Sequence, residues 1–262
     1  MKIISLVENQ SFGCCKPVHG LSLYIETPRH KMLFDVGPDE TILENAKLLG
    51  VDLTAVDTVV ISHGHYDHGG ALEAFLGVNH TANVYIQRRA FENHYSLHGT
   101  EKVPIGLNSA LMDHPQIILL DGDTVLDEEL QVFTVQHTEK CHSKMNDILL
   151  DDSGMDPFPH EQNLLVKGEE NMLFCGCGHS GLINILEKSP LRPALVVGGL
   201  HLHSPRTGEN VTETLLDDMI SELRAYSNTQ FYTCHCTGEI PYQYLSSRME
   251  NMHYLFCGAC IE

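Results

Sequence analysis

The chain has 262 residues, 42% of them hydrophobic, and a formal net charge of −19 at pH 7. This length can bury a substantial core, and α/β proteins of this size are often one domain, which we expect over residues 1–262. So acidic a chain repels phosphate backbones and anionic lipid heads. The composition therefore disfavours nucleic acid and membranes as partners, and it says nothing about the oligomeric state. We expect a small-molecule substrate.

The segment 1–7 is a short, mostly apolar run that is followed directly by Glu8. It lacks the longer apolar core and the small-residue cleavage site of a signal peptide. No apolar run in the chain approaches the roughly 20 residues that span a bilayer. The segment therefore predicts a first β-strand, and we expect a cytoplasmic protein.

Nine cysteines, an odd number, cannot all pair within one chain. Without a secretion signal, reduced thiols are expected. The motif Cys257-Gly-Ala-Cys260 could hold a structural zinc ion. One such motif without a second cysteine pair is weak evidence for zinc, so free thiols near the C-terminus are favoured.

Apolar segments rich in valine, isoleucine and leucine alternate with helical patterns along the chain. Periodicity predicts strands at residues 2–7, 21–26, 31–36, 57–61, 83–87, 116–120, 130–135, 163–167, 171–175, 194–198, 229–233 and 252–256. It predicts helices at residues 40–49, 69–77, 181–188, 211–225 and 238–248.

The order of these elements indicates an α/β fold that is not doubly wound. The first helix comes only near residue 40, after several strands, and hairpin turns are predicted at 27–30 and 168–170. Strand pairs with interspersed helices fit two sheets packed face to face with helices outside. Residues 93–115 and 136–162 show little periodicity and are predicted to be long loops that could cover a cleft.

Four candidate metal ligands follow a buried apolar strand in the motif His63-Gly-His65-Tyr-Asp67-His68. In an extended turn His63 and His65 project to the same side and can share one metal ion. Asp67 and His68 lie near a helix start and can reach a second ion. Imidazole and carboxylate together suit zinc, iron or manganese better than calcium or magnesium. A predicted strand precedes this motif and a predicted helix follows it. This context disfavours the alternative that the motif is a solvated polar loop.

Four ligands on one loop cannot close two metal sites, so further ligands must come from other strand ends. Functional residues often gather at such positions. Any one of these histidines alone would more often pack or face solvent, but their repeated position past a strand favours a joint role. The candidates are Cys177, His179, His201, His203 and His235.

The His-x-His-x-Asp-His motif after a buried strand is the signature of the metallo-β-lactamase superfamily, which the chain resembles. Within it, the chain looks like the subgroup related to the archaeal synthase of methanopterin biosynthesis, which makes 7,8-dihydropterin-6-methyl-4-(β-D-ribofuranosyl)aminobenzene 5′-phosphate. The stretches that carry this resemblance are 19–22, 33–37, 62–70, 176–181, 198–202 and 235–238.

The resemblance implies a four-layer αβ/βα sandwich of two mixed sheets with outer helices. It implies two divalent metal ions, with zinc expected and manganese or iron as alternatives. Asp35 matches the acidic residue that supports the metal loop without binding metal. By the same resemblance, the first ion is held by His63, His65 and His179, and the second by Asp67, His68 and His235.

Position 177 departs from the superfamily pattern. Many members have a Gly-Asp pair whose aspartate bridges the metals, and here the pair reads Gly176-Cys177. A thiolate can bind zinc but is softer and bulkier than a carboxylate. Cys177 is therefore either a bridging ligand, or a buried packing thiol beside a weakly held second ion.

The chemistry implied is Lewis-acid catalysis, in which bound metals lower the pKa of a water to about 7 and polarise a phosphoryl or carbonyl oxygen. Asp67 would orient that water or take its proton. His201 and His19 could contact a substrate anion or donate a proton, and His203 is a further candidate contact. The alternative for each of these three is a surface histidine.

Three functions remain open. The first is a hydrolase of a small phosphorylated or ester substrate, and the second is a pterin-forming transferase. The third is a non-catalytic metal or redox protein, in which iron and nine thiols would serve electron transfer. RNA processing, a further superfamily activity, is disfavoured by the net charge of −19.

Overall fold

The computed structural model describes residues 1–136 and 138–262. The chain divides into two compact units, which are taken in turn. Unit 1 comprises residues 1–94, 104–121 and 255–262, and unit 2 comprises residues 95–103 and 122–254. Residue 137, within the predicted loop 136–162, lies outside the described residues.

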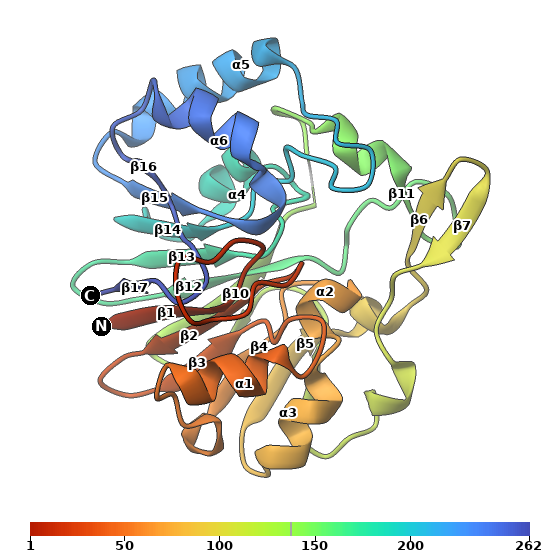
Figure 1. The fold of residues 1–262 in the computed structure, drawn as a ribbon, viewed down its shortest axis with the longest axis vertical. Coiled ribbons are helices and arrows are strands. Elements are labelled where there is room, and N and C mark those ends of the chain that lie inside the picture. Colours follow the sequence, from red (N-terminus) through yellow and green to blue (C-terminus); the bar gives the residue numbers. More distant parts are fainter. Residues whose placement is uncertain (137) are drawn as a thin grey trace. The chain divides into compact units, whose positions relative to one another are not determined.

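Unit 1 is built on a seven-stranded mixed sheet (Figure 1). The strands from β17 to β3 pair antiparallel, and those from β3 to β8 pair parallel. In sheet order the strands are β17 (Cys260–Ile261), β1 (Lys2–Val7), β2 (Ser22–Glu26), β3 (Lys31–Phe34), β4 (Thr58–Val60), β5 (Asn83–Gln87) and β8 (Ile117–Leu120). Its α-helices are α1 (Thr41–Leu48), α2 (Tyr66–Gly69) and α3 (Leu72–Val78).

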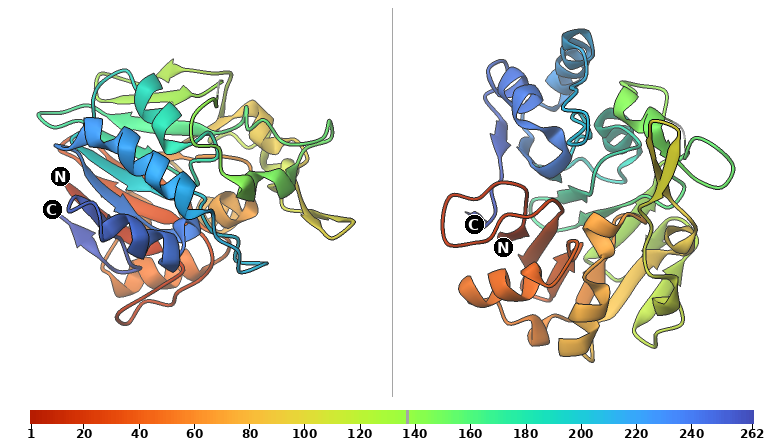
Figure 2. Two further views of the ribbon diagram at one scale, coloured as in Figure 1. Left: turned by 90° about the horizontal axis from the view of Figure 1, so that it is seen from above. Right: turned by 45° about the vertical axis from the view of Figure 1, so that its right-hand side comes forward.

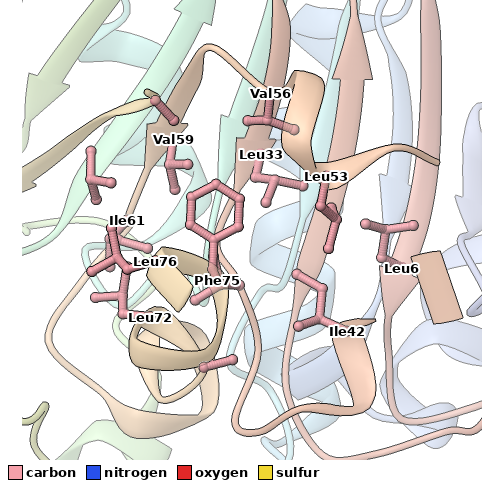
Figure 3. Packing of buried hydrophobic residues seen from close by; sticks show 14 of the residues in the cluster. Leu6, Leu33, Ile42, Leu53, Val56, Val59, Ile61, Leu72, Phe75 and Leu76 are labelled. Carbon is pink, nitrogen blue, oxygen red and sulfur yellow. The ribbon is translucent and has the colours of Figure 1, made fainter. Parts of the chain in front are cut away.

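The core of unit 1 lies between this sheet and the helices α1 and α3. Helix α3 buries Leu72, Phe75 and Leu76, at the i, i+3 and i+4 positions that form one helical face. Figure 3 shows the Phe75 ring pointing from α3 toward Leu33 and Val59 of the central strands. Residues on the other face of these strands are buried as well, which explains their near-continuous apolar runs.

Unit 2 is built on a second seven-stranded mixed sheet. In sheet order its strands are β16 (Met252–Tyr254), β15 (Gln230–Thr233), β14 (Leu195–Gly198), β13 (Met172–Cys175), β12 (Gln162–Val166), β10 (Leu130–Thr134) and β9 (Thr124–Val125). The strands from β16 to β13 are parallel and the others antiparallel. Apolar residues of α4 (Leu182–Lys188), α5 (Glu213–Leu223) and α6 (Glu239–Ser246) pack on one face of this sheet (Figures 1 and 2).

The structure confirms all twelve predicted strands and both hairpin turns, with small differences in the element ends. The predicted helix 69–77 corresponds to α3 but begins later, at Leu72, because a separate short helix, α2, ends at Gly69. The other four predicted helices are confirmed. None of the helices in the described part of the chain has the length and apolar character of a membrane span.

The prediction of two long loops without structure was wrong in part. Residues 93–115 contain a hairpin of β6 (Tyr95–His98) and β7 (Glu101–Pro104). Residues 136–162 contain a 3₁₀ helix (Lys144–Ile148) and β11 (Leu149–Leu150), which pairs with β6 in a small third sheet. This pairing joins segments about fifty residues apart, so local periodicity does not reveal it.

Replacing Phe75 by alanine should destabilise the protein by about 3–5 kcal/mol, because it leaves a cavity in a fully buried site. Urea unfolding of the purified variant measures the loss. Val78→Ala on the same helix is the matched control, since Val78 is exposed and its truncation should change stability by less than about 0.5 kcal/mol. Equal stability of both variants would contradict this packing.

Candidate metal-binding site

The motif of residues 63–68 lies in unit 1, where the chain runs from the end of β4 into the helix α2. The backbone of this turn passes too close to its neighbours for a side chain at Gly64. A Cβ atom there would lie 2.5 Å from the Ala90 carbonyl oxygen and 2.7 Å from the His94 ring. The glycine therefore allows the flanking histidines to sit in a closely packed, buried turn.

The imidazoles of this turn face one another. The Nε2 atom of His63 lies 3.0 Å from Nδ1 of His65, and the His63 ring centroid is 4.2 Å from that of His68. His63 and His68 are fully buried and His65 is 5% exposed. Such a gathering of buried imidazoles is costly unless their nitrogens have polar partners or a metal ion.

Asp35, at the end of β3, orients the turn. Its Oδ1 atom accepts a hydrogen bond from the Ser62 backbone N–H at 2.6 Å, and its Oδ2 atom accepts one from the Ser62 hydroxyl at 2.8 Å. Oδ2 also lies 2.6 Å from Nδ1 of His68, with both side chains fully buried. A carboxylate there favours the tautomer with hydrogen on Nδ1, which leaves Nε2 of His68 with a lone pair for a ligand.

The backbone of Asp35 is left-handed, with φ of 61°. Aspartate and asparagine adopt this conformation more readily than other residues with a side chain. Asp35 lies directly after β3, where the resemblance places a supporting acid. Its carboxylate contacts Ser62 and His68 of the segment that carries the candidate ligands.

Asp67 and His19 approach each other in unit 1. Oδ2 of Asp67 lies 3.3 Å from Nε2 of His19 and 3.8 Å from Nε2 of His68. The His19 side chain is 39% exposed, whereas that of Asp67 is 12% exposed. His19, predicted as a substrate contact, therefore lies within reach of solvent and beside the carboxylate that the sequence assigned to catalysis.

In unit 2, His179 is held from several sides just past β13. Asn146 makes two contacts with it, because its Oδ1 lies 2.9 Å from His179 Nδ1 and its Nδ2 donates to the His179 carbonyl oxygen at 2.9 Å. The ring stacks on Phe158, with centroids 4.3 Å apart and planes within 1° of parallel. These contacts fix the orientation of the imidazole.

Glu161 anchors the backbone of the same loop. Its carboxylate accepts hydrogen bonds from the backbone N–H groups of His179, at 2.7 Å, and Ser180, at 2.8 Å. Burial raises the pKa of this carboxyl, while the hydrogen bonds from Ser180 and His179 act in the opposite direction. The buried carboxyl of Glu161 therefore sets the backbone position of His179, a candidate ligand.

Cys177, His235 and Cys236 also gather in unit 2, with one ligand atom from each within 4.8 Å of the others. A second set of the same kind is Cys177, His179 and His201. Burial alone would raise the Cys236 pKa, but hydrogen bonds with Cys177 and His201 and the charge of nearby His235 bring it well below its usual value. A thiolate is the form that binds metal.

His201 and His203 follow β14. His201 has a left-handed backbone, with φ of 47°, and its N–H donates to the Cys236 sulfur at 3.2 Å. Its ring centroid lies 4.3 Å from that of His179, so it joins the candidate ligands of unit 2. His203 Nδ1 instead lies 3.0 Å from the side-chain oxygen of Asn210.

Sequence reasoning missed several residues that shape these clusters. Cys236 stood beside the predicted His235, but nothing in the pattern showed which way its thiol points. Asn146 and Glu161 lay in a segment without periodicity and offered no signal. His94, whose ring centroid is 5.9 Å from that of His65, was also missed.

The donor sets fit a borderline-soft divalent cation. Unit 1 offers imidazole nitrogens with a carboxylate, from His63, His65, Asp67 and His68. Unit 2 offers imidazoles with thiols, from Cys177, His179, His235 and Cys236. Zinc binds all three kinds of donor, whereas calcium and magnesium prefer oxygen ligands.

Comparisons with known proteins agree with this chemistry. Residues 15–144 match the family model described as the metallo-β-lactamase superfamily. An uncharacterized protein of Methanocaldococcus jannaschii is 25% identical over 240 residues, which cover 89% of each chain. The 7,8-dihydropterin-6-methyl-4-(β-D-ribofuranosyl)-aminobenzene-5′-phosphate synthase of the same organism is 26% identical over 269 residues, covering 91% of this chain and 88% of the synthase.

The fold is shared with a solved structure along the whole chain. A crystal structure described as that of a metal-dependent hydrolase of the β-lactamase superfamily has a TM-score of 0.82 at 25% identity. The match covers 100% of this chain and 98% of the other. This similarity confirms the predicted fold class, an α/β fold with mixed sheets and helices.

Replacing Asp35 by asparagine should reverse the tautomer of His68. The asparagine Oδ1 can keep the bond from the Ser62 N–H, which turns its NH₂ group toward His68 Nδ1 and makes that nitrogen an acceptor. Imidazole ¹⁵N chemical shifts of the metal-free protein report the change. Because asparagine tolerates the left-handed backbone, the fold should persist.

Asp57→Asn is the control for this measurement. Asp57 also contacts a histidine, His30, at 3.0 Å, but it is exposed and lies on a different part of unit 1. That variant should leave the His68 shifts unchanged. Unchanged His68 shifts in the Asp35→Asn protein would show that Asp35 does not set this tautomer.

Proposed function

Since this chain belongs to the metallo-β-lactamase superfamily, we propose that it is a metal-dependent enzyme acting on a small phosphorylated or ester substrate as a hydrolase. The observation that carries the proposal is the buried turn of unit 1, where three imidazoles and Asp67 gather against the supporting carboxylate of Asp35. A cluster of this kind has no comparable role in packing, because burying it without a ligand is unfavourable.

The ligand assignment rests on family membership and on the chemistry of each cluster. We propose two divalent ions, with zinc as the expected metal. The first would be held by His63, His65 and His179, and the second by Asp67, His68 and His235. Cys177 stands where many relatives have an aspartate, and its place among His235 and Cys236 supports a role as a soft ligand to the second ion.

When bound, divalent ions at these residues supply Lewis-acid chemistry that activates water and polarises a phosphoryl or ester oxygen. The chain's own groups position the reactants. Asp67 would orient the attacking water or take its proton. His201 would donate a proton to the leaving group, and His19, with its partly exposed ring, would contact the substrate anion.

A second candidate is a transferase that joins a pterin to an aminobenzene. It is favoured by the similarity to the pterin synthase, which extends over 91% of this chain. In that reaction the same cluster would stabilise an anionic leaving group, and an amine rather than water would attack. The two functions therefore differ in the nucleophile and share the site.

The double variant His63→Ala/His65→Ala should lose bound metal and at least about 100-fold in turnover, because it removes two proposed ligands of one ion. Elemental analysis after dialysis measures the metal, and release of p-nitrophenol from phosphate and carboxylate esters measures turnover. The matched control is His80→Ala/His98→Ala, which removes two exposed histidines. Full metal content and activity in the first variant would refute the proposal.

Turnover in ¹⁸O-labelled water should separate the hydrolase from the transferase. A hydrolase places the heavy oxygen in a product, which mass spectrometry detects with phosphate or carboxylate esters as substrates. A transferase shows no ¹⁸O incorporation and consumes its pterin donor only when an aminobenzene acceptor is added. Acceptor-dependent turnover without ¹⁸O would replace our first proposal by the second.

A further inference from the structure

Two buried cysteines that are far apart in the sequence lie in interlocking segments of unit 1. Cys15 lies in the loop between β1 and β2, and Cys257 lies just before β17. They are 5% and 3% exposed, and both carry free thiols. The proposed function uses neither of them.

The surrounding segments interlock and fix the backbone of both residues. The Cys257 N–H donates to the Gln10 carbonyl oxygen at 2.8 Å, and the Gly258 N–H donates to the Ser5 carbonyl oxygen at 2.8 Å. The rings of Phe12 and Phe256 pack edge to face, with centroids 4.2 Å apart. The loop that carries Cys15 is therefore held against the C-terminal segment.

Asn45 of α1 fastens the same region. Its Nδ2 donates to the carbonyl oxygens of Leu6, at 2.8 Å, and Lys16, at 2.9 Å, while its Oδ1 accepts from the Lys16 N–H at 2.9 Å. Nδ2 is also 3.5 Å from the Cys257 sulfur. Lys16 directly follows Cys15, so one buried amide positions both cysteine segments.

The Cys15 sulfur lies against the backbone of the residue that follows Cys257. A glycine makes this approach feasible, because a Cβ atom at position 258 would lie 3.1 Å from the Cys15 sulfur. The backbone there is also left-handed, with φ of 85°. Gly258 therefore leaves room for Cys15 beside its neighbour Cys257.

We propose that Cys15 and Cys257 form a reversible disulfide that ties the N-terminal loop to the C-terminal segment of unit 1. The oxidant is a low-molecular-weight disulfide. The thiolate of one cysteine attacks a sulfur of the oxidant, giving a mixed disulfide and one small thiol. The second cysteine, after losing its proton, attacks the protein sulfur of that mixed disulfide and releases the second small thiol.

The surroundings indicate a stable link that forms slowly. Burial raises the pKa of both thiols, and that of Cys257 reaches about 12. Few thiolates are then present at neutral pH, so attack on the oxidant is slow. Thiols of high pKa are also poor leaving groups, so the disulfide resists reduction once formed.

The two neighbouring cysteines, Cys14 and Cys260, are both exposed. Cys14 is exposed and directly precedes Cys15, so it offers an oxidant a route to the buried pair. Cys260 is exposed on β17, where it pairs with Ile4. The Cys257 sulfur lies 3.3 Å from the Leu6 carbonyl oxygen, a partner suited to a thiol rather than to a zinc-bound thiolate.

Peptide mapping of the wild-type protein tests the proposal directly. Reduced protein is incubated with oxidised glutathione, its remaining thiols are blocked with N-ethylmaleimide, and it is digested without reduction. We expect a cross-linked peptide pair joining Cys15 to Cys257 and a loss of about 2 Da in the intact protein. The melting temperature should rise by roughly 5–10 °C, because the link closes a very long loop.

Conservative variants separate this link from other thiol chemistry. Cys257→Ser should abolish both the cross-linked peptide and the rise in melting temperature, whereas Cys260→Ser should keep both. The proposal is overturned if the only disulfides map elsewhere, if glutathione adducts form without a link, or if purified protein holds zinc that Cys257→Ser releases. The readouts are mass and melting temperature, so they do not depend on the proposed enzymatic activity.

Discussion

The contact between Asp35 and the turn after β4 is the constraint on which the candidate site depends. The buried carboxylate of Asp35 accepts hydrogen bonds from the N–H and the hydroxyl of Ser62. It also contacts Nδ1 of His68, and all three distances are 2.8 Å or less. A charge that deep in the protein is tolerated only because each oxygen has a donor. The same bonds fix where β3 ends, where the turn begins and which nitrogen of His68 faces away.

In unit 2, a buried carboxylate and two further side chains also hold a candidate ligand in a fixed position. Glu161 binds the backbone of the loop that carries His179, and Asn146 and Phe158 hold its ring. In both units, then, buried polar groups hold the candidate ligands in place before any ion arrives. Such preorganisation lowers the entropy cost of binding any ligand at these residues.

The sequence predicted twelve of the strands and both hairpin turns, because these depend on short-range signals, namely apolar periodicity and turn residues. Asp35 was pointed out by the family resemblance and not by such a signal. The sequence could not predict what depends on approach between distant segments. The pairing of β6 with β11 brings Tyr95 opposite Leu150, and the support of His179 by Asn146 spans 33 residues. A single asparagine or glutamate in a segment without periodicity gives no local sequence signal that it supports a distant ligand.

The pairing of β17 with β1 has a consequence for self-association. Strand β17 has only two residues, and its pairing of Ile261 with Ile3 covers one edge of β1. Without β17, that edge would offer unpaired backbone groups to a strand of another molecule. A very short edge strand offers few such groups itself, so β17 protects the first sheet from edge-to-edge aggregation.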